Sequence, residues 1–562
     1  MTGSAQAFAQ QASGLAAQGR DAEADALYEE GVAAFPDDAR LANSAGNFHF
    51  KAGRLERALA LFERSLTLDP ALAEAGVNAA ITLGRLGQPA RATALLALLE
   101  GAADANAGYW RVRADSERQA QLYHAASISM TRAMALDPGN PKTARSRARL
   151  SLERCDREAV AHLEHALTLN RGDSRLLLDY AQALALEGRT AEALDCTTTL
   201  ATHVPGWTEA LRLHAELLWG AGETVHFADH FERVAAMQGT GPEVWLAWCD
   251  VLDGVDRHDE SAAILARARS IWPEDPVLAL AQAIALGEAG AAEEAQGVLN
   301  RFAAMTGIDW ATARGRNLLR LGNIPRAEAE LAMVLAEKPG DVAAWALIDL
   351  CWRVSGDARH DWLHGQPGLV RQIALPLDTA ERQEITALLT DLHRHSARPI
   401  GQSVKRGSQT KGALFAREEP ELARLEQALR KAMQEYRAGL PPHDADHPLL
   451  ARRDDPWAIT GSWSILLHGE GHHAAHIHPR GLLSSASYWL VPEEVDAPDQ
   501  PGWLELGNPP PGLAVGLGSL HSVRPEAGTL VMFPSTLYHG TRPINQGTRM
   551  TAAFDVTASD DD

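Results

Sequence analysis

Two patterns of hydrophobic and polar positions divide the chain. Over about the first 350 residues, apolar side chains recur every three or four positions between short breaks containing Gly, Asp or Pro, which predicts helices. From Trp457 onward the apolar stretches are short, aromatic or β-branched, and bounded by Gly and Pro, which predicts antiparallel strands of a sandwich or barrel. The stretches are WAITGSWSILLHG, SASYWLVP, GWLELG, GTLVMFPS and RMTAAFDV.

Prolines that close helical segments reveal an internal repeat. Their successive separations are 34, 68, 67, 68 and 66 residues, which correspond to one or two units of about 34. A helix–turn–helix unit of that length is the period of a tetratricopeptide repeat. The prolines are Pro36, Pro70, Pro138, Pro205, Pro273 and Pro339.

Residues inside the units agree with that period. Gly46 and Ala58 are small and twelve apart, as two closely packed antiparallel helices require, and Phe62 and Pro70 follow at the expected offsets. The first part therefore resembles tetratricopeptide arrays, with about ten degenerate units over 10–350. The resemblance implies a superhelix whose concave face binds a peptide or protein. A non-repeating helical bundle is the alternative.

The expected fold is an α+β multidomain chain. An all-α tetratricopeptide superhelix precedes a double-stranded β-helix, that is, a jelly-roll or cupin-like domain with flanking helices at 379–395 and 419–439. The predicted parts are 1–350 (repeats), 351–400 (connecting segment with a helix), 401–558 (jelly roll) and 559–562 (disordered tail).

Composition and charge narrow the function. The chain has 562 residues, too many for one core, and is 46% hydrophobic. Its 73 acidic and 52 basic residues give a net charge of −21, which disfavours nucleic acid and anionic membranes as partners. The N-terminus lacks the pattern of a signal peptide, no apolar run is long enough to span a bilayer, and only four scattered cysteines occur. We expect a cytoplasmic protein.

The stretch GHHAAHIHPRG (471–481) holds the strongest chemical signal. His476 and His478 are two positions apart, so on an extended segment both rings leave the same face. His539 follows a strand-like run some sixty residues later. Imidazoles bind Fe(II), Zn or Cu, and three protein ligands leave coordination positions open, as a catalytic site requires. His472 and His473 are expected to form the turn entering the strand, beside the site or exposed.

An arginine completes this constellation. Arg549 lies ten residues after His539 on the next predicted strand, where its guanidinium could bind the distal carboxylate of a dicarboxylic co-substrate. Tyr488, on the strand after the histidine pair, could add a hydroxyl to the same pocket.

These residues carry a family resemblance. Residues 355–558 resemble bacterial 2-oxoglutarate/iron(II)-dependent oxygenases fused to tetratricopeptide repeats, through "GQSVKRGSQTKGALF", "SWSILLHGEGHHAAHIHPRGLLSSASYWLVP", "GWLELGNPP" and "VRPEAGTLVMFPSTLYHGTRPINQGTRMTAAFDV". The resemblance implies Fe(II) held by His476, His478 and His539. It also implies 2-oxoglutarate held by Arg549, with Tyr488 and Thr551, and O2 as the oxidant. The implied activity is hydroxylation of a peptide or protein recruited by the concave face of the repeats.

The motif departs from the common pattern at one position. Most 2-oxoglutarate oxygenases have Asp or Glu where this chain has His478, so the site is one charge more positive, which affects iron affinity. The subfamily it resembles often has His-x-His. Glu505, a nearby strand carboxylate, is a remote alternative ligand.

Several roles stay open. A polar loop could line the substrate entrance or only cap a turn, whereas Trp463 and Trp503 are expected to be packing residues. The whole chain could instead be an interaction scaffold with a catalytically silent barrel. A three-histidine dioxygenase or hydrolase without 2-oxoglutarate is a third hypothesis. The polar residues of the loop are Gln402, Arg406, Ser408, Gln409 and Thr410.

Overall fold

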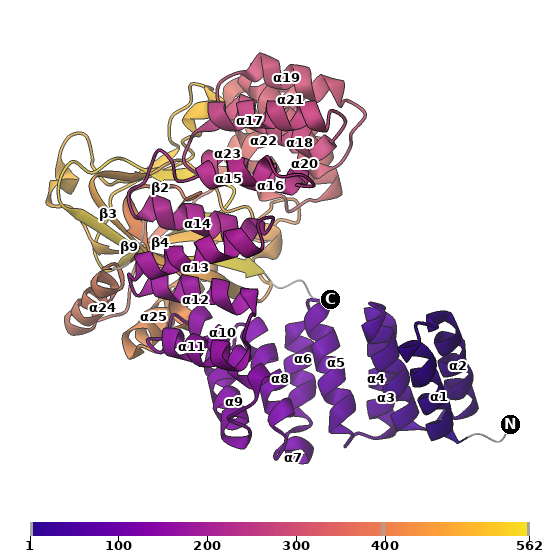
Figure 1. Ribbon diagram of the computed structural model, residues 1–562. Coiled ribbons are helices and arrows are strands. Elements are labelled where there is room, and N and C mark those ends of the chain that lie inside the picture. The colour runs from indigo at the N-terminus through magenta and orange to yellow at the C-terminus, as the bar shows by residue number, and fades with distance from the viewer. Residues whose placement is uncertain (1–3, 395, 397–399, 559–562) are drawn as a thin grey trace. The chain divides into compact units, whose positions relative to one another are not determined.

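The structure, a computed structural model, describes residues 4–394, 396 and 400–558 and divides the chain into two compact units (Figure 1). Unit 1 comprises residues 1–179 and unit 2 residues 180–562. Within the described ranges, every helix is too short or too polar to cross a bilayer.

Unit 1 is built from helices packed as successive antiparallel pairs, of which α3 and α4 are one (Figure 1). Helix α12 begins in unit 1 and ends in unit 2. The helices are α1 (Ala5–Ala17), α2 (Asp21–Ala34), α3 (Ala39–Lys51), α4 (Leu55–Leu68), α5 (Ala73–Arg85), α6 (Pro89–Ala97), α7 (Glu100–Ala103), α8 (Ala107–Gln119), α9 (Tyr123–Leu136), α10 (Pro141–Glu153), α11 (Ala159–Leu169) and α12 (Ser174–Leu186).

The predicted repeat residues hold these pairs together. Pro36 and Pro70 each stand two residues beyond the end of a helix, α2 and α4, where proline cannot continue the helix. A Cβ on Gly46 would lie 2.6 Å from the Phe62 ring, so only glycine permits this approach of α3 to α4. Ala58 and Phe62 are fully buried beside it. The predicted all-helical tetratricopeptide-like repeats are confirmed.

Unit 2 begins with more helices of the same kind. The prolines after α13, α17 and α21 again follow the helix end by two residues, so the repeat continues across the unit boundary in the sequence. The helices are α13 (Thr190–His203), α14 (Thr208–Gly220), α15 (Asp229–Ala235), α16 (Pro242–Asp253), α17 (His258–Ile271), α18 (Pro276–Glu288), α19 (Ala292–Arg301), α20 (Ile308–Arg320), α21 (Ile324–Glu337), α22 (Val342–Ser355) and α23 (Arg359–His364).

The rest of unit 2 contains two antiparallel sheets. The larger sheet has the order β1-β7-β4-β9-β3-β2 and the smaller the order β6-β5-β8. This arrangement is compatible with the predicted jelly roll. The strands are β1 (Arg371–Ala374), β2 (Val404–Gln409), β3 (Trp457–His473), β4 (Leu483–Leu490), β5 (Leu504–Leu506), β6 (His521–Val523), β7 (Thr529–Pro534), β8 (His539–Thr541) and β9 (Thr548–Ala558).

The larger sheet separates a hydrophobic core from the cavity side. Helices α24 (Thr379–Leu392) and α25 (Pro420–Ala438) pack on one face, where Met550, Ala552 and Phe554 of β9 join the core. The opposite face packs against the smaller sheet through Tyr488 and Phe533, among others. Strand alternation therefore sends every second residue of β9 towards the functional cavity.

Four local predictions have different outcomes. Helix α24 ends at Leu392, and the predicted end at residue 395 lies outside the described residues, as does the predicted tail 559–562. Strand β1 joins the sheet from within 351–400, so the predicted domain boundaries remain a proposal. His472 and His473 form the end of β3 and not a turn, because they pair with Lys405 and Val404 of β2.

Candidate metal and co-substrate site

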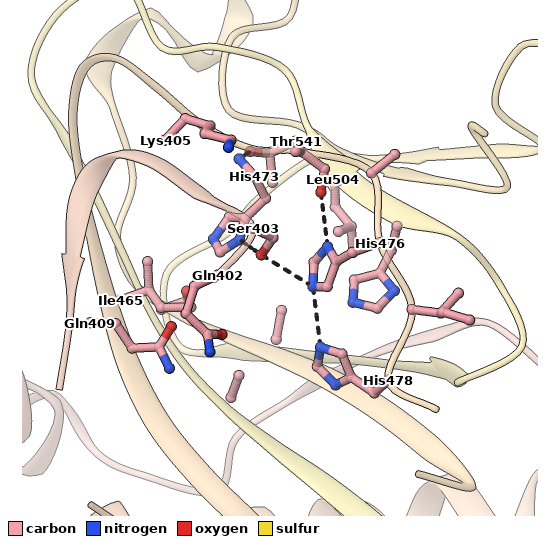
Figure 2. Close-up of a pocket in the computed structure, with 18 of the residues that line it drawn as sticks. Gln402, Ser403, Lys405, Gln409, Ile465, His473, His476, His478, Leu504 and Thr541 are labelled. Atoms are coloured by element: carbon pink, nitrogen blue, oxygen red, sulfur yellow. Dashed lines mark hydrogen bonds between the residues drawn. The ribbon is translucent and has the colours of Figure 1, made fainter. Parts of the chain in front are cut away.

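A cavity of about 540 Å³ lies on the side of the larger sheet that faces away from α24 and α25. Strands β3, β4, β7 and β9 contribute to its wall, and His539 is one of its lining residues. His476 and His478 lie side by side in it (Figure 2). Its volume is in the range of small-molecule sites.

Backbone pairing brings the three predicted histidines together. His476 forms an isolated antiparallel bridge with His539, through His476 N to His539 O at 3.0 Å and the reverse bond at 2.9 Å. The Nε2 atom of His478 lies 3.1 Å from the Nε2 atom of His476. One potential ligand atom from each ring lies within 4.8 Å of the others, so the three could hold one metal ion.

Hydrogen bonds on the outer nitrogens orient all three rings. Each Nδ1 donates to an oxygen that can only accept, which leaves Nε2 unprotonated in a neutral ring. The Nε2 atoms of His476 and His478 thus face one another with lone pairs, an arrangement that a cation between them would stabilise. The bonds run from His476 to Ala474 O (2.8 Å), from His478 to Asp555 Oδ1 (2.5 Å) and from His539 to Leu537 O (3.1 Å).

Burial keeps two of these imidazoles neutral. It lowers the pKa of His476 to about 4, and it holds the pKa of His539 well below its ordinary value, with neighbouring histidines adding to both effects. Neutral imidazole is the form that binds metal. The donor set therefore fits a divalent transition metal in the ordinary pH range.

Arg549 is the buried cation of the cavity. Its side chain is 1% exposed, and Nε donates to Gly502 O at 3.0 Å. The guanidinium carbon lies 5.1 Å from the centre of the Tyr488 ring. Burial lowers the pKa of Arg549, and the neighbouring Tyr488 acts in the opposite direction.

Tyr488 and Thr551 stand on paired strands beside Arg549. They are cross-strand partners, and Thr551 lines the cavity two residues after Arg549. Tyr488 is fully buried, which raises its pKa, and its hydroxyl makes no hydrogen bond of good geometry within the described ranges. An unsatisfied hydroxyl next to a buried guanidinium is a fitting environment for a carboxylate.

Asp555 is a functional candidate absent from the sequence prediction. It accepts the Nδ1 proton of His478 and lies on β9, six residues after Arg549. Strand alternation places residues 549, 551, 553 and 555 on one face, and the first three line the cavity. The even spacing from Arg549 was the signal that could have identified Asp555.

The segment 401–410, predicted as a polar loop, is largely strand β2, because Val404–Gln409 pair with β3, and its polar residues lie on different sides of the sheet. Gln402 and Gln409 line the cavity, whereas Arg406 forms an ion pair with Glu470 outside it. The remaining two residues form hydrogen bonds away from the cavity. Ser408 Oγ lies 2.9 Å from His393 Nδ1, and Thr410 Oγ1 accepts a hydrogen bond from Ser464 N at 2.9 Å.

The two tryptophans predicted to be packing residues, Trp463 and Trp503, have different positions. Trp463 lines the cavity, with its ring 5.5 Å from that of His478, which the sequence did not predict. Trp503 donates from Nε1 to Val495 O at 2.8 Å and has the expected packing role.

The other candidate ligands lie around the three-histidine group. Glu505 accepts from Arg542 Nε at 3.0 Å and is outside that group among the described residues. Ser403 bridges His473 and His476, with Oγ 3.1 Å from His473 Nδ1 and 3.3 Å from His476 Nε2 (Figure 2). His473 therefore supports the site through Ser403, whereas the His472 ring hydrogen-bonds to the backbone O of Glu470.

Helices of unit 2 complete the cavity wall. The turn after α16 contributes Gly254 and Asp256, and α20 contributes Arg316. Gly401 N donates to Gly254 O at 3.0 Å, and Lys405 Nζ lies 2.5 Å from Asp256 Oδ2. This contribution has no local sequence signal, because it depends on contacts about 150 residues apart.

Comparisons with known proteins found similarities to two parts of this chain. A tetratricopeptide repeat protein from Parabacteroides merdae is 15% identical, with 43% of this chain and 97% of that one covered, at a TM-score of 0.36. A thermophilic tetratricopeptide protein of Thermus thermophilus is 24% identical, with 32% and 99% covered, at a TM-score of 0.27. A sequence search of curated proteins found no match. Residues 461–555 match the model of the family described as "Putative 2OG-Fe(II) oxygenase", and this range contains all three histidines, Arg549 and Asp555.

Proposed function

We propose that the chain is an iron(II)- and 2-oxoglutarate-dependent dioxygenase that hydroxylates a peptide or protein in the cytoplasm. The observation that carries the proposal is that one potential ligand atom from each of three histidines lies within 4.8 Å of the others, with each ring oriented by a hydrogen bond on Nδ1. His476, His478 and His539 would hold the iron. Three protein ligands leave coordination positions for a bidentate co-substrate and O2.

Arg549, Tyr488 and Thr551 would hold 2-oxoglutarate. The buried guanidinium supplies a paired donor geometry for the distal carboxylate, and the Tyr488 hydroxyl supplies a further donor. A carboxylate there would neutralise the charge of Arg549, whose side chain is buried. Isolated burial of that charge is otherwise unfavourable.

The bound iron and 2-oxoglutarate would supply the oxidising chemistry, with succinate and CO2 as co-products and a hydroxylated C–H bond as the result. The protein's own part is positioning. Ala474 O, Leu537 O and Asp555 fix the ring orientations, and the walls of the cavity hold the substrate carbon near the centre. No side-chain acid or base is required.

A polypeptide substrate is supported by the position of the repeats. Helices of tetratricopeptide type commonly bind peptides, and here the turn after α16 forms part of the cavity wall. A segment bound by the helices of unit 2 would therefore have direct access to the candidate site. The scarcity of cysteine supports the cytoplasm as its location.

Anaerobic addition of Fe(II) and then 2-oxoglutarate tests the activity. We expect a visible metal-to-ligand charge-transfer band, and succinate formation once air is admitted. His539→Ala should lose the band through loss of metal. Arg549→Ala should retain metal but need far more 2-oxoglutarate, and the exposed His443→Ala is the control. Absence of both band and succinate in the folded wild type would refute the proposal, and tightly held zinc without 2-oxoglutarate-dependent O2 uptake would favour a different metal enzyme.

A further inference from the structure

Two glutamine side chains on the β2 side of the cavity have unused hydrogen-bonding capacity. Gln402 and Gln409 both line the cavity (Figure 2); Gln402 is exposed and Gln409 is half-buried. Neither carboxamide has a hydrogen-bond partner among the described residues, although Ser403, the neighbour of Gln402, is engaged with two histidines. Each carboxamide offers both a donor and an acceptor to whatever enters the cavity.

The charged side chains of the cavity, by contrast, are compensated. Besides Arg549, four charged residues of the described ranges line it: Lys405 and Asp256 form an ion pair, Arg316 pairs with Glu288, and Asp253 is hydrogen-bonded to His258 and Ser261. With the adjoining Glu288 and Arg320, three carboxylates face three cationic side chains, so this region carries no net formal charge. The contacts are Lys405 with Asp256 (2.5 Å), Arg316 with Glu288 (2.8 Å), Arg320 with Glu288 (2.5 Å), and Asp253 with both His258 (2.9 Å) and Ser261 (2.9 Å).

This distribution determines which substrate groups the cavity can accept. The proposed function uses the charge of Arg549 for 2-oxoglutarate, so a charged substrate group would find no free counter-charge there. Placing an uncompensated charge in a partly dehydrated cavity is unfavourable. A group that both donates and accepts would satisfy the two glutamines, whereas a carboxylate only accepts and an ammonium only donates.

We propose, building on the function above, that the cavity recognises an uncharged carboxamide side chain of the substrate, that of asparagine or glutamine, through Gln402 and Gln409. The two glutamines are specificity-determining residues. Sites with polar groups placed for hydrogen bonding discriminate strongly against isosteres that leave those groups unpaired. Gln409 pairs with Ile465 of β3, and Trp463 lies two residues earlier on the same strand and also lines the cavity. Its ring provides an apolar surface for the remainder of the substrate side chain.

Three isosteric probes test this specificity. The N-acetyl, N-methylamide derivatives of asparagine, aspartate and leucine are titrated by calorimetry into full-length protein loaded anaerobically with Fe(II) and 2-oxoglutarate. We expect the asparagine probe to bind about tenfold or more tightly than either of the others. Gln402→Leu and Gln409→Leu should each reduce that preference, and the double variant should abolish it. The exposed Gln427→Leu on α25 is the matched control.

The outcomes separate this inference from the proposed function. Equal affinities for the three probes, tighter binding of aspartate or leucine, or no binding of the asparagine probe and of its glutamine counterpart at the solubility limit would overturn the inference. Weakened 2-oxoglutarate binding in the glutamine variants, with probe preference unchanged, would assign the glutamines to the co-substrate and also overturn it. A failed charge-transfer band speaks against the dioxygenase alone, and repeating the titration without metal or 2-oxoglutarate then tests the glutamines separately.

Discussion

Replacing Asp555 should weaken metal binding although this residue is not a candidate ligand. Its carboxylate accepts the Nδ1 proton of His478 at 2.5 Å, and both side chains are mostly buried, 22% and 18% exposed. The bond orients the ring and makes Nε2 a stronger donor to a metal. Asp555→Ala removes the acceptor and the charge, whereas Asp555→Asn retains an acceptor and removes only the charge.

The magnitude follows from charge and distance. A carboxylate about 6 Å from a dication, one imidazole away, interacts by roughly 5 kcal/mol at an effective dielectric constant of 20, and less with solvent access. Loss of such a supporting group typically weakens metal binding about 10–100-fold, or roughly 1.4–2.8 kcal/mol. We expect the upper end for Asp555→Ala and the lower end for Asp555→Asn.

Competition titrations with Co(II), followed by its visible spectrum, measure this effect in the absence of turnover. The exposed Asp446→Asn is the control for a general change in net charge, and thermal unfolding checks that each variant is folded. If Asp555→Ala binds Co(II) as tightly as the wild type, Asp555 does not support a metal ligand and this reasoning is wrong.

Three further predictions concern the co-substrate, the pH dependence of stability and the cavity wall. Arg549→Lys keeps the charge but loses the planar paired donors, so we expect about 100-fold weaker 2-oxoglutarate binding in charge-transfer titrations, with Co(II) affinity unchanged. Burial lowers the pKa of His393 from 6.5 to about 4, with His468 contributing, so the unfolded chain binds the extra proton and stability falls as pH drops from about 6.5 to 4. Urea unfolding measures the free energy of unfolding at pH 7 and at pH 5. The decrease between these two pH values should be roughly 2 kcal/mol smaller for His393→Gln than for the wild type. A Cβ on Gly254 would lie 2.7 Å from Gly401 N, so Gly254→Ala should lower the free energy of unfolding by about 1–3 kcal/mol. The amides of residues 401–405 should also exchange hydrogen faster in this variant than in the wild type.

Much of the fold was predictable because its information is local. Pro36 and Pro70 end helices where the repeat period places them, and Gly46 permits the close helix contact expected of it. The strands from Trp457 onward were predictable for the same reason, since alternation and turn residues act over a few positions. Strand β1 was not predicted, because its four residues join the sheet only through pairing with β7, about 160 residues later.

The candidate site was predictable where the chemistry is concentrated and less so where it depends on tertiary contacts. His476, His478 and His539 were found from residue type and spacing, and the structure brings them together. Asp555 was overlooked although it shares a strand face with Arg549, because an aspartate near a chain end is most often exposed. The contribution of Gly254 to the cavity could not be predicted, since no local pattern connects a repeat turn to β2.

The residues between and beside the candidate ligands connect the site to the helices of unit 2. His476 and His478 turn towards the centre, whereas Ile477 between them packs against the core of α20, α21 and α22. Tyr538, directly before His539, is buried in the same core. Arg353 of α22 reinforces this contact by donating to Gly507 O and Gly518 O, both at 2.5 Å. Ring positions at the candidate metal site therefore depend on helix packing, and a ligand that shifts α20–α22 would act on the imidazoles through Ile477 and Tyr538.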